Sequence, residues 1–393
     1  MTNNRSNLFA GRMGNLPDNF FAGFISKIGK MQAAGHDIIR LDVGSPDLPP
    51  SPHIIEALYR SASIPGHHGY QPYAGTAALR QAWAAMYQRV FGVELDSDHE
   101  ILPLLGSKEG IFNLIMALVD PGDIVLVPDP SYMTYTRGTI FAGGEPYYLP
   151  LLAAKDYLPD LDSVPEQVAQ RARMLWLNYP NNPTAATATL EFFSRAVDFA
   201  RDYGILLCHD AAYTQITYNG YQAPSLLQVP GAKADVIEFN TLSKSHNMAG
   251  WRVGAALGNP AVLRALYKLK TNVDSSHFLP IMDAATTTMT GDQGWLVERN
   301  DIYRQRRDLV VRTLSTLGLT PTNANASLYV WCNIPAGGSA LEFANRLLDE
   351  AYISVTPGTV FGTQGEGHVR FSLTSPLERI ERAMERLKDW MKR

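Results

Sequence analysis

The central part of the chain alternates short apolar runs with longer amphipathic segments, and this order limits the possible folds. Apolar runs that predict strands lie at 101–104, 124–127, 174–177, 205–208 and 236–239. Segments with helical periodicity separate several of them, at 109–119, 132–141 and 190–203. Alternating strands and helices favour a mostly parallel sheet that is covered by helices on both faces. The sequence therefore predicts an α/β protein.

The two ends of the chain have a different pattern. Runs at 328–332 and 368–373 predict strands, with helices predicted at 341–351 and from Pro376 onward. Near the N-terminus a predicted helix at 20–33 leads into a strand at 38–43. We expect the two ends to pack together as one small α+β domain. Its N-terminal segment would be residues 1–51 and its C-terminal part residues 286–393, beside a large domain of residues 52–285.

Composition argues against several classes of function. The net charge of -4 and the absence of a basic run argue against a nucleic-acid partner. No signal peptide and no stretch of about 18 apolar residues is present, so no membrane association is expected. Cys208 and Cys332 have neither a disulfide-type nor a zinc-type spacing, which predicts buried thiols, no metal site and a cytoplasmic protein.

In open α/β sheets, ligands bind at the carboxyl ends of the strands, so residues directly after each predicted strand are candidates. Gly106, Ser107 and Lys108 follow the 101–104 strand and begin a helix, where free N–H groups can hold a phosphate. On its own, that pattern more often marks a tight turn. Asn182 lies in the proline-rich turn after 174–177 and can present an amide.

Charged residues follow the later strands. Asp210 ends the 205–208 strand, where its charge needs a partner or a role as a helix cap. Lys244 follows 236–239, with Ser243 before it and Arg252 eight residues after it. Partial burial lowers the pKa of an amine, so Lys244 could form an imine, although an ordinary loop lysine is the alternative. Arg370 lies in a strand that should be buried and needs an anion, either a ligand carboxylate or a structural salt bridge.

These segments resemble those of the class I and II aminotransferases, which bind pyridoxal 5'-phosphate (PLP). The resemblance rests on Ser-Lys-Ser-His-Asn-Met-Ala-Gly-Trp-Arg at 243–252, on Asn-Pro-Thr at 182–184, and on further residues in the family's order over almost the whole chain. It implies a fold-type I enzyme in which Lys244 is the catalytic residue and carries PLP as a Schiff base. One departure is Ala185, where the family usually has glycine; a turn that needs a positive φ would strain alanine.

The resemblance also implies contacts to the cofactor ring. Tyr132 would stack on the ring, while Asn182 and Tyr213 would bind its 3'-oxygen. Asp210 would keep the ring nitrogen protonated, so that the ring can accept electrons when the substrate loses its Cα proton.

Further contacts are implied for the phosphate and the substrate. Ser243 and Arg252 would hold the phosphate together with Ser107 and Lys108. Tyr70 would reach the same phosphate from a second subunit, which implies a homodimer with shared sites. Arg370 would bind the substrate α-carboxylate in a bidentate manner, with help from the backbone of Gly44 and from Asn182.

We therefore predict a PLP-dependent aminotransferase that moves the amino group of an amino acid to a 2-oxo acid. Its motifs are most similar to LL-diaminopimelate aminotransferase-like and aspartate aminotransferase-like members, which leaves the amino donor open. A PLP-dependent β-lyase of the same fold, such as a cystathionine β-lyase, is the alternative. A PLP-domain transcription regulator would need an N-terminal winged-helix domain, and the short segment before Gly44 leaves no room for one.

Overall fold

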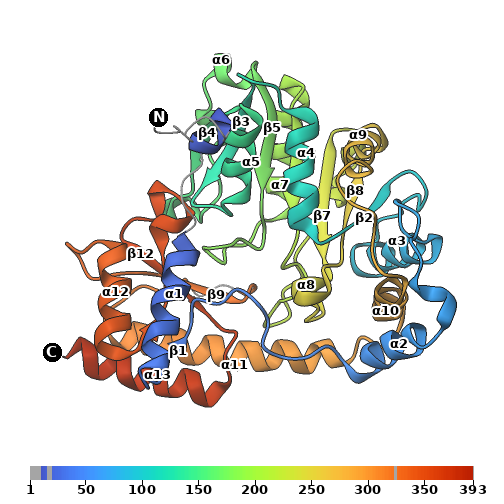
Figure 1. Cartoon of the computed structure of the whole chain (residues 1–393). Coiled ribbons are helices and arrows are strands. Elements are labelled where there is room, and N and C mark those ends of the chain that lie inside the picture. The colour runs from blue at the N-terminus through green and yellow to red at the C-terminus, as the bar shows by residue number, and fades with distance from the viewer. Residues whose placement is uncertain (1–9, 16–19, 323–324, 393) are drawn as a thin grey trace, which may run out of the picture.

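The computed structural model describes residues 10–15, 20–322 and 325–392. Its centre is a seven-stranded sheet with the strand order β2-β8-β7-β6-β5-β3-β4 (Figure 1). Neighbouring strands are parallel except where β8 pairs with β7 and β2, so β8 alone runs against the others in this sheet. The predicted, mostly parallel α/β sheet is confirmed. The strands are β2 (Ile101–Leu104), β3 (Ile124–Asp129), β4 (Glu145–Pro150), β5 (Ala172–Leu177), β6 (Leu206–Asp210), β7 (Val236–Thr241) and β8 (Gly254–Gly258).

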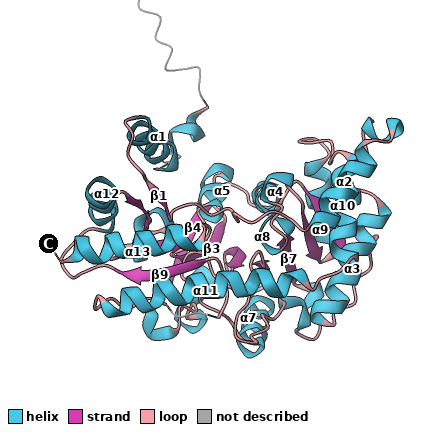
Figure 2. Ribbon diagram, turned by 90° about the horizontal axis from the view of Figure 1, so that it is seen from below, coloured by secondary structure: helices cyan, strands magenta, loops and turns pink. Residues whose placement is uncertain are grey.

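Helices cover both faces of this sheet, as predicted (Figures 1 and 2). Successive strand residues point to opposite faces, so each strand contributes to two apolar cores. Leu126 and Leu175 pack with the helices of one face, while Val127 and Trp176 pack with those of the other. The first face carries α2 (Pro52–Ala62), α3 (Ala77–Phe91), α7 (Leu190–Tyr203) and α10 (Leu279–Thr290); the second carries α4 (Ser107–Leu118), α5 (Thr134–Ala142) and α9 (Pro260–Lys270).

A smaller layer is built from both ends of the chain. An antiparallel sheet of β11, β12 and β9 lies there, and β1 pairs in parallel with β10. Helix α1 lies beside α12 (Figure 2), with Ile28 and Leu348 in one apolar cluster and Lys27 2.8 Å from Asp349. The domain boundaries themselves stay a prediction. The elements are α1 (Phe20–Ala33), β1 (Ile39–Arg40), α11 (Trp295–Thr316), β9 (Tyr329–Asn333), α12 (Ala340–Ala351), β10 (Ile353–Ser354), β11 (Thr356–Pro357), β12 (His368–Ser372) and α13 (Leu377–Met391); the short helices α6 (Glu166–Ala169) and α8 (Leu242–Ser245) belong to the central part.

The predicted strand at 38–43 is wrong in length, because β1 contains only two residues. Leu41 still forms backbone hydrogen bonds with Ser354 and Ser372, but the two carbonyls that follow bind side chains. The carbonyl of Asp42 accepts a hydrogen bond from Arg370 Nη2 at 3.1 Å, and that of Val43 accepts one from Thr374 Oγ1 at 2.8 Å. The segment after β1 therefore lies against the end of β12.

Two other sequence predictions concern membrane association and the thiols. Within the described ranges, no helix has both the length and the apolar character needed to cross a membrane. Cys208 and Cys332 are buried free thiols, as predicted.

Candidate active site

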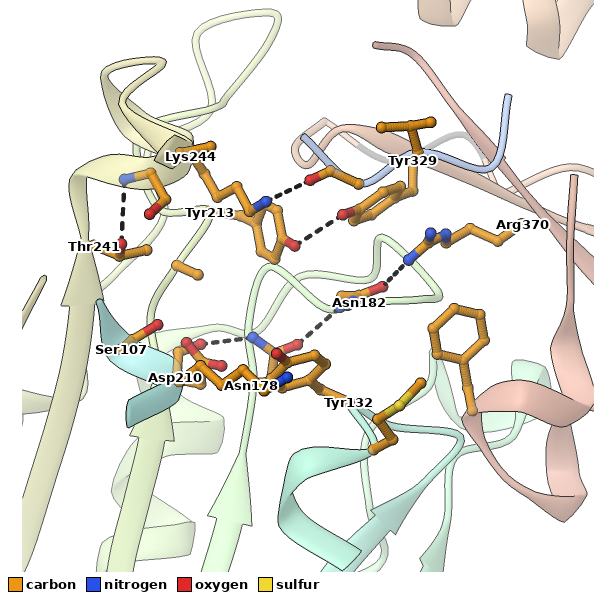
Figure 3. A pocket seen from close by; sticks show the side chains of 18 of the residues that line it. Ser107, Tyr132, Asn178, Asn182, Asp210, Tyr213, Thr241, Lys244, Tyr329 and Arg370 are labelled. Carbon is orange, nitrogen blue, oxygen red and sulfur yellow. Dashed lines mark hydrogen bonds between the residues drawn. The ribbon is translucent and has the colours of Figure 1, made fainter. Parts of the chain in front are cut away.

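A cavity of about 640 Å³ lies at the carboxyl ends of β5, β6 and β7, between the large sheet and the smaller layer (Figure 3). Side chains from segments more than 300 residues apart in sequence meet there. All predicted site residues except Tyr70 line this cavity, namely Gly44, Ser107, Lys108, Tyr132, Asn182, Asp210, Tyr213, Ser243, Lys244, Arg252 and Arg370.

Lys244 lies in the short helix α8, directly after β7. The Thr241 side chain caps this helix by accepting a hydrogen bond from the Ser243 N–H at 3.2 Å. The Lys244 ammonium donates to the carbonyl of Gly44 (Figure 3) and has no carboxylate within salt-bridge distance among the described residues. Burial lowers the pKa of Lys244 below its ordinary value, and the nearby Arg370 lowers it further. The amine is thus easier to deprotonate than a solvent-exposed lysine.

Asp210 ends β6 and is almost fully buried. Its Oδ2 accepts a hydrogen bond from the Tyr135 hydroxyl at 2.9 Å, and its backbone carbonyl accepts one from Asn178 Nδ2 at 2.6 Å. Oδ1 has no hydrogen-bond partner among the described residues, and Asp210 caps none of the described helices. Burial raises the pKa of Asp210 to about 6, against the opposing effect of the Tyr135 hydrogen bond. A cationic or N–H group in the cavity would give Oδ1 the partner that it lacks.

The turn after β5 links Asp210 to Arg370 through two asparagines (Figure 3). Asn178 Oδ1 accepts the Asn182 N–H at 2.8 Å, and Asn182 Oδ1 accepts a hydrogen bond from Arg370 Nη1 at 2.8 Å. Ala185 in this turn has a φ of 60°, so the turn does require the left-handed region and alanine is strained there by about 1–2 kcal/mol.

Arg370 projects from β12 and is 4% exposed. Its guanidinium carbon lies 4.1 Å from the centre of the Tyr329 ring and 4.8 Å from that of Phe361. It donates hydrogen bonds to the side-chain oxygens of Asn182 and Thr356 and to the backbone carbonyl of Asp42, all of which are neutral. Its Nε has no partner in the described part of the chain. No described carboxylate lies within 4.0 Å of it, so no structural salt bridge neutralises this buried charge.

A second cationic end of the cavity lies beside the start of α4. Gly106 precedes this helix with a φ of 84°, and a Cβ there would collide with the Arg252 guanidinium. Arg252 Nη1 donates to Ser243 Oγ at 3.3 Å and to the carbonyl of Ala249 at 2.8 Å. Arg252 also has no carboxylate partner among the described residues. Glycine therefore allows the guanidinium to lie against the backbone at the helix N-terminus.

Several side chains that contact the predicted site residues were not predicted, among them Tyr135, Asn178, Tyr329 and Phe361. Asn178 directly follows β5, so strand-end reasoning could have found it. Tyr135 lies within α5, three residues after the predicted Tyr132, and does not follow a strand directly. Tyr329 and Phe361 come from the smaller layer, and no local pattern marks them. Tyr70 lies outside the cavity and is 93% exposed.

Comparison with known proteins agrees with this geometry. The sequence model of the family described as "Aminotransferase class I and II" matches residues 36–387. The chain is 49% identical over 379 residues to the LL-diaminopimelate aminotransferase of Desulforudis audaxviator, covering 96% of this chain and 97% of that relative. It is 46% identical over 379 residues to the LL-diaminopimelate aminotransferase of Moorella thermoacetica, with coverage of 96% and 97%.

Solved structures give the same result. The substrate-bound BacF of Bacillus subtilis superposes with a TM-score of 0.94 at 34% identity, covering 97% of each chain. A probable N-succinyldiaminopimelate aminotransferase from Thermus thermophilus superposes with a TM-score of 0.90 at 34% identity, covering 94% of this chain and 100% of that one. The fold is therefore that of solved aminotransferases.

Proposed function

The chain belongs to the class I and II aminotransferase family and is an aminotransferase, and we propose that its cavity binds PLP together with an amino acid. One observation carries this proposal: the cavity holds charged groups that no opposite charge or hydrogen-bond donor of the described chain satisfies. Lys244, Arg252 and Arg370 have no carboxylate partner among the described residues, and Asp210 Oδ1 lacks a donor. A phosphate, a substrate carboxylate, an aldehyde that reacts with an amine, and a protonated ring nitrogen would satisfy all four.

The phosphate would bind at the cationic end beside α4. Arg252 and the Ser243 hydroxyl lie there together with Ser107 at the first position of that helix. Free N–H groups and the positive end of the helix dipole favour a dianion at this position. Lys108, the second residue of α4, would add a further positive charge.

The ring would lie between Tyr132 and the end of β6, with Asp210 Oδ1 beside its nitrogen. Bound PLP supplies an electron sink for the electron pair that is left when the Cα proton of the substrate is removed. Asn182 and Tyr213 each place a polar group in the cavity and would bind the 3'-oxygen. The residues described here fit the cofactor, because each of its polar groups has a complementary side chain.

Lys244 is the amine that would act in the reaction. Because burial lowers its pKa, a larger fraction of Lys244 is neutral near pH 7 than for an exposed lysine. The neutral Nζ can take the proton from the substrate Cα and later return it, which is general base and then general acid catalysis. Arg370 orients the same substrate, because its planar guanidinium pairs with the α-carboxylate and the Gly44 backbone lies beside it.

The amino donor is proposed to be LL-diaminopimelate, with 2-oxoglutarate as the acceptor. The choice of donor is supported by sequence identity, over nearly the whole chain, to relatives named LL-diaminopimelate aminotransferase. To test it, the PLP-loaded enzyme is mixed with single amino acids and the loss of visible absorbance is followed. Responses to LL-diaminopimelate and glutamate are expected. A response to aspartate, alanine or aromatic amino acids without one to LL-diaminopimelate would reject the proposed donor. The assignment as an aminotransferase would stand.

A separate assay of product release from cystathionine addresses the β-lyase alternative, which no comparison supports. A β-lyase would release pyruvate and ammonia from cystathionine without any 2-oxo acid. An aminotransferase needs the 2-oxo acid for each further turnover. Cystathionine cleavage at the rate of amino transfer would therefore contradict the proposal.

A homodimer with shared sites is proposed from the exposed position of Tyr70. Large exposed apolar side chains mark contact surfaces, and the stretch 55–73 carries several of them: Ile55, Tyr59, Ile64, Tyr70 and Tyr73. If Tyr70 enters the cavity of the partner subunit, mixing inactive Tyr70→Ala and Lys244→Ala chains should restore part of the activity. A monomer in light scattering, or no recovery on mixing, would contradict the shared site.

A further inference from the structure

Tyr329 connects the two ends of the cavity. It lies at the start of β9, is 3% exposed, and lines the cavity between Lys244 and Arg370 (Figure 3). Its ring face lies against the Arg370 guanidinium, with 4.1 Å between the guanidinium carbon and the ring centre. Its hydroxyl lies 3.0 Å from the Tyr213 hydroxyl, and the two rings meet edge to face. One side chain therefore contacts both the carboxylate-binding end and a cofactor-facing tyrosine.

The backbone of Gly44 fixes the place of the Tyr329 hydroxyl. A Cβ on Gly44 would lie 3.0 Å from that oxygen, so the hydroxyl lies directly against the glycine. The carbonyl of the same glycine accepts the hydrogen bond from Lys244. Tyr329 is thus held between the segment after β1 and Tyr213, and it has little freedom to rotate.

The Tyr329 ring face constrains the Arg370 guanidinium, and the centre of the Phe361 ring lies 4.8 Å from the guanidinium carbon. A guanidinium that is held between aromatic faces keeps its plane, and cation–π attraction is strong where water is excluded. Since Nη1 is bound to Asn182, the plane and the edge of the guanidinium are both set before a ligand arrives. Such preorganisation raises affinity, because less freedom is lost on binding.

We propose that Tyr329 is a positioning residue for amino transfer: its ring holds Arg370 in the orientation that receives an α-carboxylate, and its hydroxyl orients that of Tyr213. This inference rests on the proposed function of the cavity. The titratable groups that face Tyr329 are Lys244, Arg370, Tyr213 and Tyr132. Burial alone would raise the pKa of Tyr329, but Arg370, Lys244 and the hydrogen bond with Tyr213 hold it below its ordinary value.

Two variants separate the two roles. Tyr329→Phe removes the hydroxyl and keeps the ring, whereas Tyr329→Leu removes both. Affinity is measured calorimetrically on the PLP-loaded enzyme with 2-oxoglutarate, which carries an α-carboxylate and no amino group. We expect Tyr329→Phe to bind within about twofold of the unchanged enzyme, and Tyr329→Leu to bind about 10-fold more weakly, as for loss of one desolvated cation–π contact.

The hydroxyl is tested by a pH titration of the visible absorbance of the bound cofactor. Both variants lack the hydroxyl, so both should shift the midpoint equally, by roughly half a pH unit or more, as for loss of one hydrogen bond. Tyr218 provides a matched control, because its buried hydroxyl donates to the Ser327 carbonyl and Arg307 lies 5.0 Å from its ring centre, outside the cavity. Tyr218→Phe and Tyr218→Leu should change neither the affinity nor the midpoint.

Unchanged affinity in Tyr329→Leu, or an unchanged midpoint in Tyr329→Phe, would overturn the inference. If Tyr329→Leu does not fold, Tyr329→Met replaces it, because methionine fills more of the space without an aromatic face. Failure of the proposed function would give a distinguishable result, because the wild-type enzyme would then show no visible absorbance with PLP or no binding of 2-oxoglutarate.

Discussion

Asp210 should make the cofactor-free protein less stable at neutral pH, and replacing it should reveal this. Burial raises its pKa to about 6, so above that pH it carries a charge in a nearly solvent-free position. Asp210→Asn removes the charge and keeps an oxygen that can accept the Tyr135 hydroxyl. We therefore expect Asp210→Asn to stabilise the cofactor-free protein at pH 8, although it should weaken the hold on PLP.

The size of the effect follows from the two pKa values. An ordinary aspartate has a pKa of 3.8 and Asp210 one of about 6. The difference, about 2.2, corresponds to about 3 kcal/mol of unfolding free energy. Between these values the folded state binds the proton and the unfolded state does not, so stability falls as the pH rises. The penalty is small below about pH 4, about half present at pH 5, and complete above about pH 6.

Urea denaturation of the cofactor-free protein at pH 5 and pH 8 measures this penalty. Asp210→Asn is compared with the unchanged chain and with Asp198→Asn, which removes an aspartate that is 67% exposed. The gain of Asp210→Asn should be about twice as large at pH 8 as at pH 5, and Asp198→Asn should show no such gain. If Asp210→Asn and the wild-type protein have equal free energies of unfolding at pH 8, the reasoning is refuted. A gain in this free energy that does not depend on pH would refute it as well.

Three further predictions concern single side chains of the cavity and of its wall. Lys244→Ala should keep the fold but lose the visible absorbance with PLP and nearly all turnover; a spectrum like that of the unchanged enzyme would contradict the role of this lysine. Arg370→Ala should raise KM for amino acids about 100-fold, in line with the loss of a buried charge pair, and Arg370→Lys should raise it less because lysine keeps the charge. Steady-state kinetics on amino acids and on an amine without a carboxylate measures this, and equal effects on both substrates would contradict it. Asp129 accepts hydrogen bonds from the Thr363 hydroxyl at 2.7 Å and from the N–H groups of residues 363 and 364 at 3.1 Å, which holds the loop that carries Phe361. Asp129→Asn should therefore speed hydrogen exchange at 358–365 and raise KM several-fold with a smaller change in kcat, whereas unchanged exchange would show that this loop is held by other contacts.

Much of the fold could be predicted, because the alternation of apolar and polar residues directly reflects which side chains are buried. The helices at 20–33 and 190–203 and the strand at 101–104 have the predicted bounds. Candidate residues could be predicted for a related reason: parallel strands bring their carboxyl ends to one edge, so residues that follow different strands meet. Asn182, Asp210 and Lys244 each lie at or after the end of a strand of the large sheet, and all three line the cavity.

The rest depends on contacts between distant segments. Tyr329 and Phe361 belong to the smaller layer, and their place beside Arg370 follows from how that layer packs on the sheet. The strand predicted at 38–43 ends early, and the carbonyls of Asp42 and Val43 bind the side chains of Arg370 and Thr374 instead of a strand. The pattern of apolar residues is the same whether a backbone group binds a strand or a side chain, so the sequence could not distinguish the two.

The partners of buried charges separate the candidate site from structural ion pairs. Arg306 and Arg370 are 3% and 4% exposed, so both charges are buried. Arg306 binds Asp47 with both arms of its guanidinium, at 2.7 and 3.0 Å, so its charge is neutralised within the chain. Arg370 binds only neutral oxygens. A buried guanidinium without an anion is costly, and Arg370 also lines the cavity. This location is what supports the proposal that a ligand supplies its anion, and residue type alone would never have told these two arginines apart.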